Sequence, residues 1–224
     1  MDAHERRRRI ILSTIVRDIP KSFWEDARTR ARQTYLDIYH EIAAYPNMLT
    51  EQRLEMLNQV RFFRMEHLLS VLAQEHGFTW SAKLLTENSH HYVYATLGAV
   101  ALTQTYVPAI GDMPKPAKFR DKLAAMNEIA ARPRLALGDE APAIFATKEF
   151  YGLLAHNPVG KRFNESDQRL GMIQFCVPAP LCVKWEAQFA IEEIVSAHDV
   201  VAPAQKQGRR LPWKKRNDKR DQQK

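Results

Sequence analysis

Cysteine, glycine and long apolar stretches are all scarce in this 224-residue chain. Two cysteines are too few for a disulfide scaffold, and eight glycines exclude a collagen-like chain. The longest stretch without charge, 88–111, contains glutamine, histidines and a proline, so it does not suit a membrane interior. With 45% hydrophobic and 26% charged residues, the chain has the composition of a globular protein, and we expect it in the cytoplasm and not in a membrane.

The net charge of +7 is concentrated at the C-terminal end. Residues 209–224 contain eight Lys or Arg and two Asp, whereas the other 208 residues hold 25 basic and 24 acidic side chains. A second, smaller basic cluster is Arg6–Arg9. We expect 203–224 to be a disordered basic tail, because no apolar residue recurs there at helix or strand spacing.

The first half of the chain has the apolar spacing of helices. Residues 23–45 and 51–76 both carry apolar side chains at steps of three and four, and Pro46 separates the two segments. Ser22 and Glu25 form a capping-box pattern at the first helix start. The short connection predicts that the two helices are antiparallel neighbours. A short helix is expected around 81–85.

The second half contains most of the prolines and glycines and has the spacing of strands. Residues 91–97 and 99–107 alternate around Gly98, which predicts a β-hairpin; a buried helix is the alternative. Residues 183–191 also alternate, although a helix over 183–194 competes. The remaining predicted elements are a loop over 108–116, a helix over 117–131, strands at 144–146, 150–156 and 170–177, and a helix over 192–198.

These patterns predict an α+β protein. An antiparallel helix pair at the N-terminal end should pack on a mostly antiparallel sheet of four to six strands. We expect one domain over 1–202, helical in 10–87 and rich in strands in 88–202, followed by the tail 203–224. The sequence does not indicate an oligomeric state.

Arg61 and His67 are separated by five residues on the second predicted helix. This spacing resembles the active-site motif of HEPN-type ribonucleases, which are small helical proteins. The resemblance covers one helix, and it implies that Arg61 would stabilise a phosphate while His67 would act as acid or base without a metal. A metal-independent ribonuclease is therefore one hypothesis.

Histidines in the second half provide a different hypothesis, a small-molecule enzyme or metalloprotein. His90 and His91 begin a predicted strand, where consecutive side chains point to opposite faces, so together they cannot chelate one metal. Either could meet His156 or a carboxylate in space. Carboxylate–imidazole neighbours also occur on helices, as in Glu66-His67 and Glu75-His76, but without the spacing of a di-iron bundle. We therefore expect no metal and no cofactor.

The loop after the strand 150–156 has the residues of an anion site. His156, Lys161 and Arg162 flank a glycine there, and such a loop could hold a phosphate or carboxylate. The alternative is a solvated hairpin loop. Cys176 and Cys182 lack the further ligands that a zinc site needs, so we expect both to be reduced thiols that behave as small hydrophobes.

The leading hypothesis is a non-enzymatic cytoplasmic regulator or inhibitor, because the charge is isolated at one end and no polar motif converges elsewhere. It would bind a macromolecular partner, such as a protein machine that handles nucleic acid. The tail would contact nucleic acid or an acidic surface, with an aromatic ring stacking on a base among cations. Its expected contact residues are Arg209, Arg210, Trp213, Lys214, Lys215 and Arg216.

Overall fold

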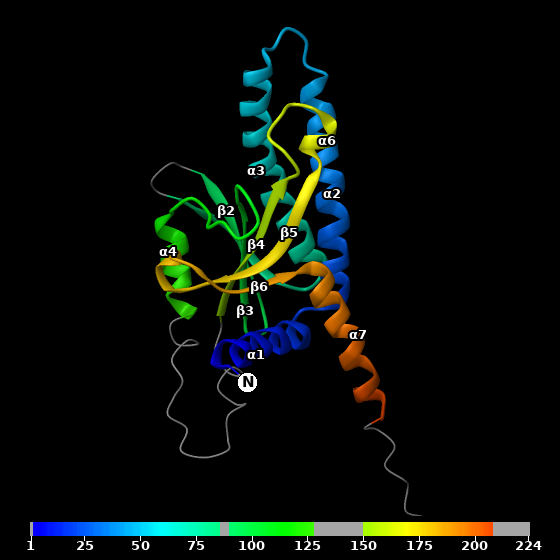
Figure 1. Cartoon of the computed structure of the whole chain (residues 1–224), viewed down its shortest axis with the longest axis vertical. Coiled ribbons are helices and arrows are strands. Elements are labelled where there is room, and N and C mark those ends of the chain that lie inside the picture. Colours follow the sequence, from blue (N-terminus) through cyan, green and yellow to red (C-terminus); the bar gives the residue numbers. More distant parts are fainter. Residues whose placement is uncertain (1, 86–89, 128–149, 208–224) are drawn as a thin grey trace, which may run out of the picture.

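The computed structural model describes residues 2–85, 90–127 and 150–207 (Figure 1). It confirms the predicted α+β class, with six α-helices and one six-stranded sheet in these residues. The strand order is β1-β2-β3-β4-β5-β6, and every neighbouring pair is antiparallel except β3 and β4. The strands are β1 Thr79–Leu84, β2 His91–Leu97, β3 Val100–Tyr106, β4 Phe150–Pro158, β5 Leu170–Pro178 and β6 Trp185–Ala190.

The helices pack on both faces of this sheet. Their bounds are α1 Ala3–Asp18, α2 Lys21–Ala43, α3 Thr50–Glu75, α4 Lys118–Ala124, α6 Glu165–Gln168 and α7 Ile191–Gln207, with a 3-10 turn η1 at Pro180–Cys182. The main core joins α1, α2, α3 and α7 to one face of the sheet. A smaller cluster beneath α4 includes Ala101, Tyr151 and Leu153. None of the helices described is long and apolar enough to cross a membrane.

The two long helices α2 and α3 lie side by side and extend past the sheet (Figure 1). Ion pairs join Arg30 to Glu75 at 2.6 Å and Arg64 to Glu41 at 3.0 Å, which places the helices antiparallel. The predicted capping box at Ser22 is wrong, because α2 begins at Lys21, two residues before the predicted start, and its N-cap Pro20 makes no side-chain cap. Ser22 instead contacts the ring of His76.

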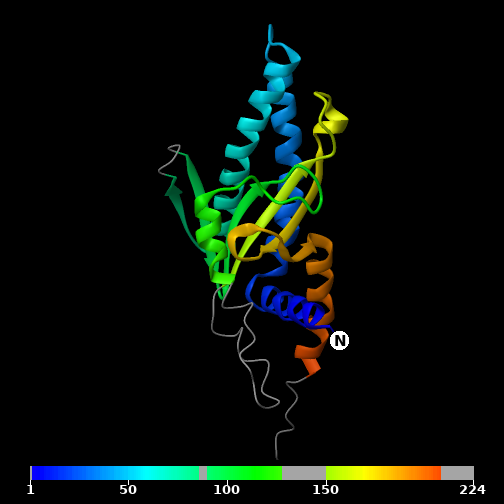
Figure 2. The ribbon, with the colours of Figure 1, turned by 60° about the vertical axis from the view of Figure 1, so that its left-hand side comes forward.

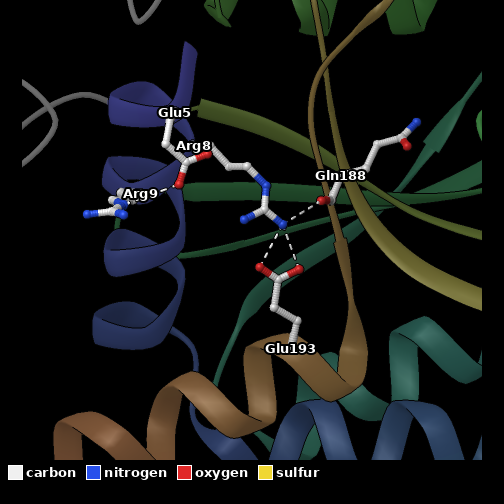
Figure 3. A network of polar contacts seen from close by, with 5 residues as sticks. All are labelled: Glu5, Arg8, Arg9, Gln188 and Glu193. Atoms are coloured by element: carbon white, nitrogen blue, oxygen red, sulfur yellow. Dashed lines mark hydrogen bonds and ion pairs between the residues drawn. The ribbon is translucent and has the colours of Figure 1, made fainter. Parts of the chain in front are cut away.

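The sequence predicts a helical region only from residue 10 and no separate helix over α1, where Arg6–Arg9 stand out as charge. Ile11, Ile15 and Ile19 bury one side of this segment in the core. Basic side chains on the other side form ion pairs. Arg8 donates to Glu193 at 2.6 Å (Figure 3), and Arg7 donates to Glu186 at 2.6 Å. As a result, α1 lies beside α7 and β6 (Figure 2), and these two cations are engaged within the fold.

The predictions for the remaining segments have different outcomes. The short helix around 81–85 is wrong, since β1 occupies this segment and the hydrogen bonds of β2 override its weak local preference. Strands β2, β3, β4, β5 and β6 confirm the strands expected there. Helix α7, Ile191–Gln207, is longer than the predicted 192–198. The predicted strand 144–146, the end of the helix 117–131 and the tail 208–224 lie outside the described residues.

Candidate active site

Strands β2 and β3 pair over only part of their length. Their partners are Ala95↔Leu102, Thr96↔Ala101 and Leu97↔Val100. Continued in the same register, Val93 would lie opposite Gln104, but this pairing is absent. The backbone amide of Val93 instead donates to Oε2 of Glu66, at 2.6 Å, and so finds its partner on α3.

The Glu66 carboxylate is held between the two separated strands. Its Oε1 accepts a hydrogen bond of 2.6 Å from Nε2 of Gln104, while Oε2 accepts from Val93. Only 8% of Glu66 is exposed. Burial raises the pKa of this carboxyl group to about 7, although the two hydrogen bonds and the charge of Arg120 oppose the increase. Burial between the strands therefore makes Glu66 a weaker acid than an exposed glutamate, and its two hydrogen bonds fix its orientation.

A chain of buried hydrogen bonds continues from Gln104 into the core. Oε1 of Gln104 lies 2.8 Å from Nε2 of His156, and Nδ1 of His156 lies 2.6 Å from the Tyr35 hydroxyl. Since an amide oxygen only accepts, Nε2 of His156 carries the proton, and its Nδ1 accepts from Tyr35. Burial, and secondarily the charge of Arg61, lowers the pKa of His156 to about 3, so the ring is neutral. Each donor in this series of hydrogen bonds therefore faces the next residue in the direction of Glu66, from Tyr35 through His156 to Gln104.

A pocket of about 580 Å³ opens above the separated strands. Helix α3, the start of β2 and helix α4 enclose it. Its walls combine aromatic rings with a few polar groups: Asn58, Gln59, Phe62, Phe63, Glu66, Leu85, His90, Tyr92, Gln104, Pro116, Ala117, Phe119 and Arg120. This volume and mixture are typical of small-molecule sites.

Arg120 is the cation of this pocket. Its guanidinium donates to Thr105 Oγ1 at 3.4 Å and to the carbonyl of Lys115, both neutral acceptors. Its Nε is buried without a hydrogen-bond partner among the described residues. Burial lowers the pKa of Arg120, as expected for a cation withdrawn from water. Phe119, the preceding residue, stacks on Tyr92 with ring centroids 4.1 Å apart.

The structure does not bring Arg61 and His67 together. Arg61 is 2% exposed, lies over the Tyr35 ring at 4.4 Å, and donates to Gln168 and Asn58. His67 is exposed in a groove between α2 and α3. Six helical positions separate the two side chains by well over a right angle around the helix axis. They therefore do not form one site.

The histidines of the second half have three different environments. His156 is buried in the hydrogen-bonded chain, and His90 lines the pocket beside Phe62 and Phe63. His91 is exposed at the start of β2. The structure thus connects His156 with the pocket that His90 lines, through Gln104 and Glu66, and not through a shared metal position.

The loop after β4 does not gather its predicted anion site. His156 is 1% exposed, whereas Lys161 and Arg162 are both exposed on the loop. The carboxylate of Asp167 occupies the inside of the loop: it accepts from the Arg162 amide at 3.0 Å and lies close against Gly160. An acidic group of the chain itself therefore fills the position that an anion would take.

Other reactive side chains form no comparable site in the described part of the chain. Asp26, Glu75 and His76 are close enough to hold a metal, but Arg30 already neutralises Glu75, and Asp26 lies 3.0 Å from the His76 ring. Cys176 and Cys182 are free thiols, and burial raises their pKa values to about 12 and about 11. Neither is a thiolate at neutral pH.

The comparisons with known proteins give no independent guide to this site. No protein-family model matches the chain, and no curated protein or solved structure is significantly similar to it. The interpretation of the pocket rests on its own geometry.

The sequence does not predict the central residues of the pocket. It points to Glu66 only as the neighbour of His67, and it predicts no site at Gln104 or Arg120. One signal was present: Glu66 stands among the buried residues Met65, Leu68 and Leu69, and Gln104 lies in an apolar strand. A polar side chain in such a run requires a buried partner.

Proposed function

We propose that this protein is an enzyme that acts on a small molecule, with Glu66 as its general acid–base group. The observation that carries this proposal is the position of the carboxylate, buried at a pocket and held by Val93 and Gln104. A group that accepts and releases a proton near neutral pH is suited to acid–base catalysis. The pKa of Glu66, raised by burial to about 7, meets that requirement.

The residues around Glu66 have complementary tasks in this proposal. The ordered chain from Tyr35 through His156 fixes the amide of Gln104, which in turn orients the carboxylate. His156 and Tyr35 are thus positioning residues. Arg120 supplies positive charge in the same pocket, and such a cation stabilises negative charge on a substrate as it reacts.

This proposal develops the hypothesis of a small-molecule enzyme that uses His156 with His90 or His91, and it involves no metal. The regulator hypothesis stays a prediction, because its contact residues in 209–216 lie outside the described residues. The engagement of Arg7 and Arg8 in ion pairs removes two of the cations that would have supported it at the other end. The ribonuclease hypothesis has no comparable support from the positions of Arg61 and His67.

Deuterium exchange tests the proposal and does not require that the product be identified. A general base that removes a proton from carbon replaces it with deuterium when the reaction is run in D₂O. We expect the full-length protein to exchange a C–H position next to a carbonyl group in at least one member of a panel of small ketones and 2-oxo acids, observed by proton NMR. Glu66→Gln should slow exchange by about 10²–10⁴-fold.

The matched control is Glu55→Gln, which changes an exposed carboxylate on the same helix. Its exchange rate should equal that of the wild type. Equal rates in the wild type and Glu66→Gln would contradict the assigned role of Glu66.

A further inference from the structure

The charge of the pocket indicates which substrates it accepts. Arg120 has only neutral hydrogen-bond partners, the Thr105 hydroxyl and the Lys115 carbonyl, and its Nε has none among the described residues. Arg120 is half-buried, and a guanidinium group that is partly withdrawn from water is stabilised by pairing with an anion, because removing an unpaired charge from water is costly. Among the described residues, Glu66 is the only carboxylate that lines the pocket, and both of its oxygens are already engaged.

The partners of Glu66 direct it away from an ion pair with Arg120. Val93 and Gln104 each donate at 2.6 Å, and no ion pair between Glu66 and Arg120 forms in the described structure. Glu66 is also protonated over part of the neutral range, since burial raises its pKa to about 7. The neighbouring Asp121 and, more weakly, Glu66 stabilise the positive charge of Arg120 electrostatically, but neither forms an ion pair with it among the described residues.

The side chains that line the pocket indicate the chemical character of the ligand beyond its charged group. Rings of Phe62, Phe63, Tyr92 and Phe119 line the pocket together with His90. Tyr92 and Phe119 already form a tilted stack. Flat aromatic molecules gain most from such surfaces, because they bury a large apolar area and add offset or edge contacts with each ring.

We propose that the pocket binds an aromatic anion, a planar ring with a carboxylate or phosphate group that Arg120 holds. The guanidinium presents several N–H donors in a fixed plane, a geometry that suits both kinds of anion. This inference rests on the proposed function and specifies its substrate class. With the anionic group at Arg120, the ring lies among the aromatic walls and faces the Glu66 carboxyl group.

Calorimetric titration of the full-length protein tests this inference. The probes are benzoate and phenyl phosphate, with benzamide and benzyl alcohol as neutral counterparts. We expect at least one of the two anions to bind at least about tenfold more tightly than its neutral counterpart, because a charge-assisted hydrogen bond is lost in the latter. Equal affinity for charged and neutral probes, or no binding of either anion at millimolar concentration, would overturn the inference.

Substitutions on α4 test whether Arg120 is the residue that binds the anion. Arg120→Gln should weaken the binding of the preferred anion by about tenfold or more and leave the neutral probes unchanged. Lys122→Gln, which removes an exposed cation on the same helix, should leave all affinities unchanged. Unchanged binding of the preferred anion to folded Arg120→Gln would contradict the assigned role of Arg120.

Two controls keep the result decisive. If Arg120→Gln does not fold, Arg120→Lys keeps the charge without the planar donor set and should still weaken binding of the preferred anion; unchanged affinity would count against the inference. Glu66→Gln should retain binding of this anion, because the carboxylate is not its partner. Equal deuterium exchange by the wild type and Glu66→Gln would therefore refute the proposed catalysis without altering these affinities, and the two proposals can fail separately.

Discussion

Oε2 of Glu66 accepts the backbone amide of Val93 at 2.6 Å and so takes the position at which β3 would otherwise pair with β2. The same carboxylate accepts from Gln104, the residue that the register places opposite Val93. A side chain of α3 thus bridges two strands that have separated. The carboxylate of Glu66 thus gives the backbone amide of Val93 a hydrogen-bond partner, and it lies at the pocket beside the separated strands.

The dependence of stability on pH tests this burial. Because the pKa of Glu66 is raised from an ordinary 4.5 to about 7, the folded protein binds this proton more tightly than the unfolded chain. The resulting stabilisation is fully present below pH 4.5 and is lost as the pH rises through 7. The unfolding free energy of the wild type minus that of Glu66→Gln should therefore fall by roughly 3 kcal/mol between pH 4.5 and pH 8.

Urea denaturation at the two pH values provides this difference. The same comparison with Glu55→Gln should show no change, since that carboxylate is exposed. A difference between the wild type and Glu66→Gln that is constant with pH would show that Glu66 is solvated.

The buried chain behind Gln104 predicts a larger cost for His156 than for any exposed histidine. His156→Leu deprives the Tyr35 hydroxyl and the Gln104 carbonyl of their partners. Two unsatisfied buried groups should lower the unfolding free energy by about 2–5 kcal/mol at pH 7. His67→Leu, at an exposed position, should change it by less than about 0.5 kcal/mol. Similar losses for the two variants in thermal or urea unfolding would contradict the hydrogen-bonded chain.

The ion pair between Arg8 of α1 and Glu193 of α7 gives a prediction for the N-terminal arginines (Figure 3). Arg8 donates to Glu193 and lies over the Phe189 ring, 4.6 Å from its centroid. Arg8→Ala should cost about 1–2 kcal/mol of unfolding free energy, because it loses both contacts in a half-buried setting. Arg9→Ala should be nearly neutral, since 67% of its side chain is exposed. Equal losses of unfolding free energy in the two variants would contradict the described position of α1 against α7 and β6.

The packing of α2 on α3 is tested by two adjacent positions. Ile38 is 1% exposed and packs with Ile42 and Leu57, whereas Asp37 is exposed. Ile38→Ala should cost about 2–4 kcal/mol, and Asp37→Ala should cost roughly nothing. The urea midpoints of the two variants distinguish them, and a reversed order would mean that the buried face of α2 is misassigned.

Regular spacing made much of the fold predictable from sequence. The apolar positions of α2 recur at steps of three and four, and the hairpin of β2 and β3 alternates around Gly98. Strand β1 lacks such a signal, because five of its six residues are exposed and its pairing with β2 alone defines it. Helix α1 was not predicted in full because Arg7 and Arg8 pair with residues 179 and 185 positions away.

The site was less predictable than the fold for the same physical reason. Glu66 and Gln104 are 38 positions apart, and their contact depends on the separation of β2 from β3. No local pattern signals where two strands stop pairing. The neutral His156, by contrast, was identified as a candidate, but its partners Tyr35 and Gln104 emerge only when α2 packs on the sheet.

Titration of the Glu66 carboxyl group itself tests the central claim most directly. Carbon-13 NMR of glutamate-labelled protein, with the signal assigned by its loss in Glu66→Gln, reports the midpoint of ionisation. A midpoint near pH 7 is predicted, because the carboxyl is buried between β2 and β3. A midpoint near 4.5, the ordinary value for glutamate, would contradict the account of Glu66 as the acid–base group of a sheltered pocket.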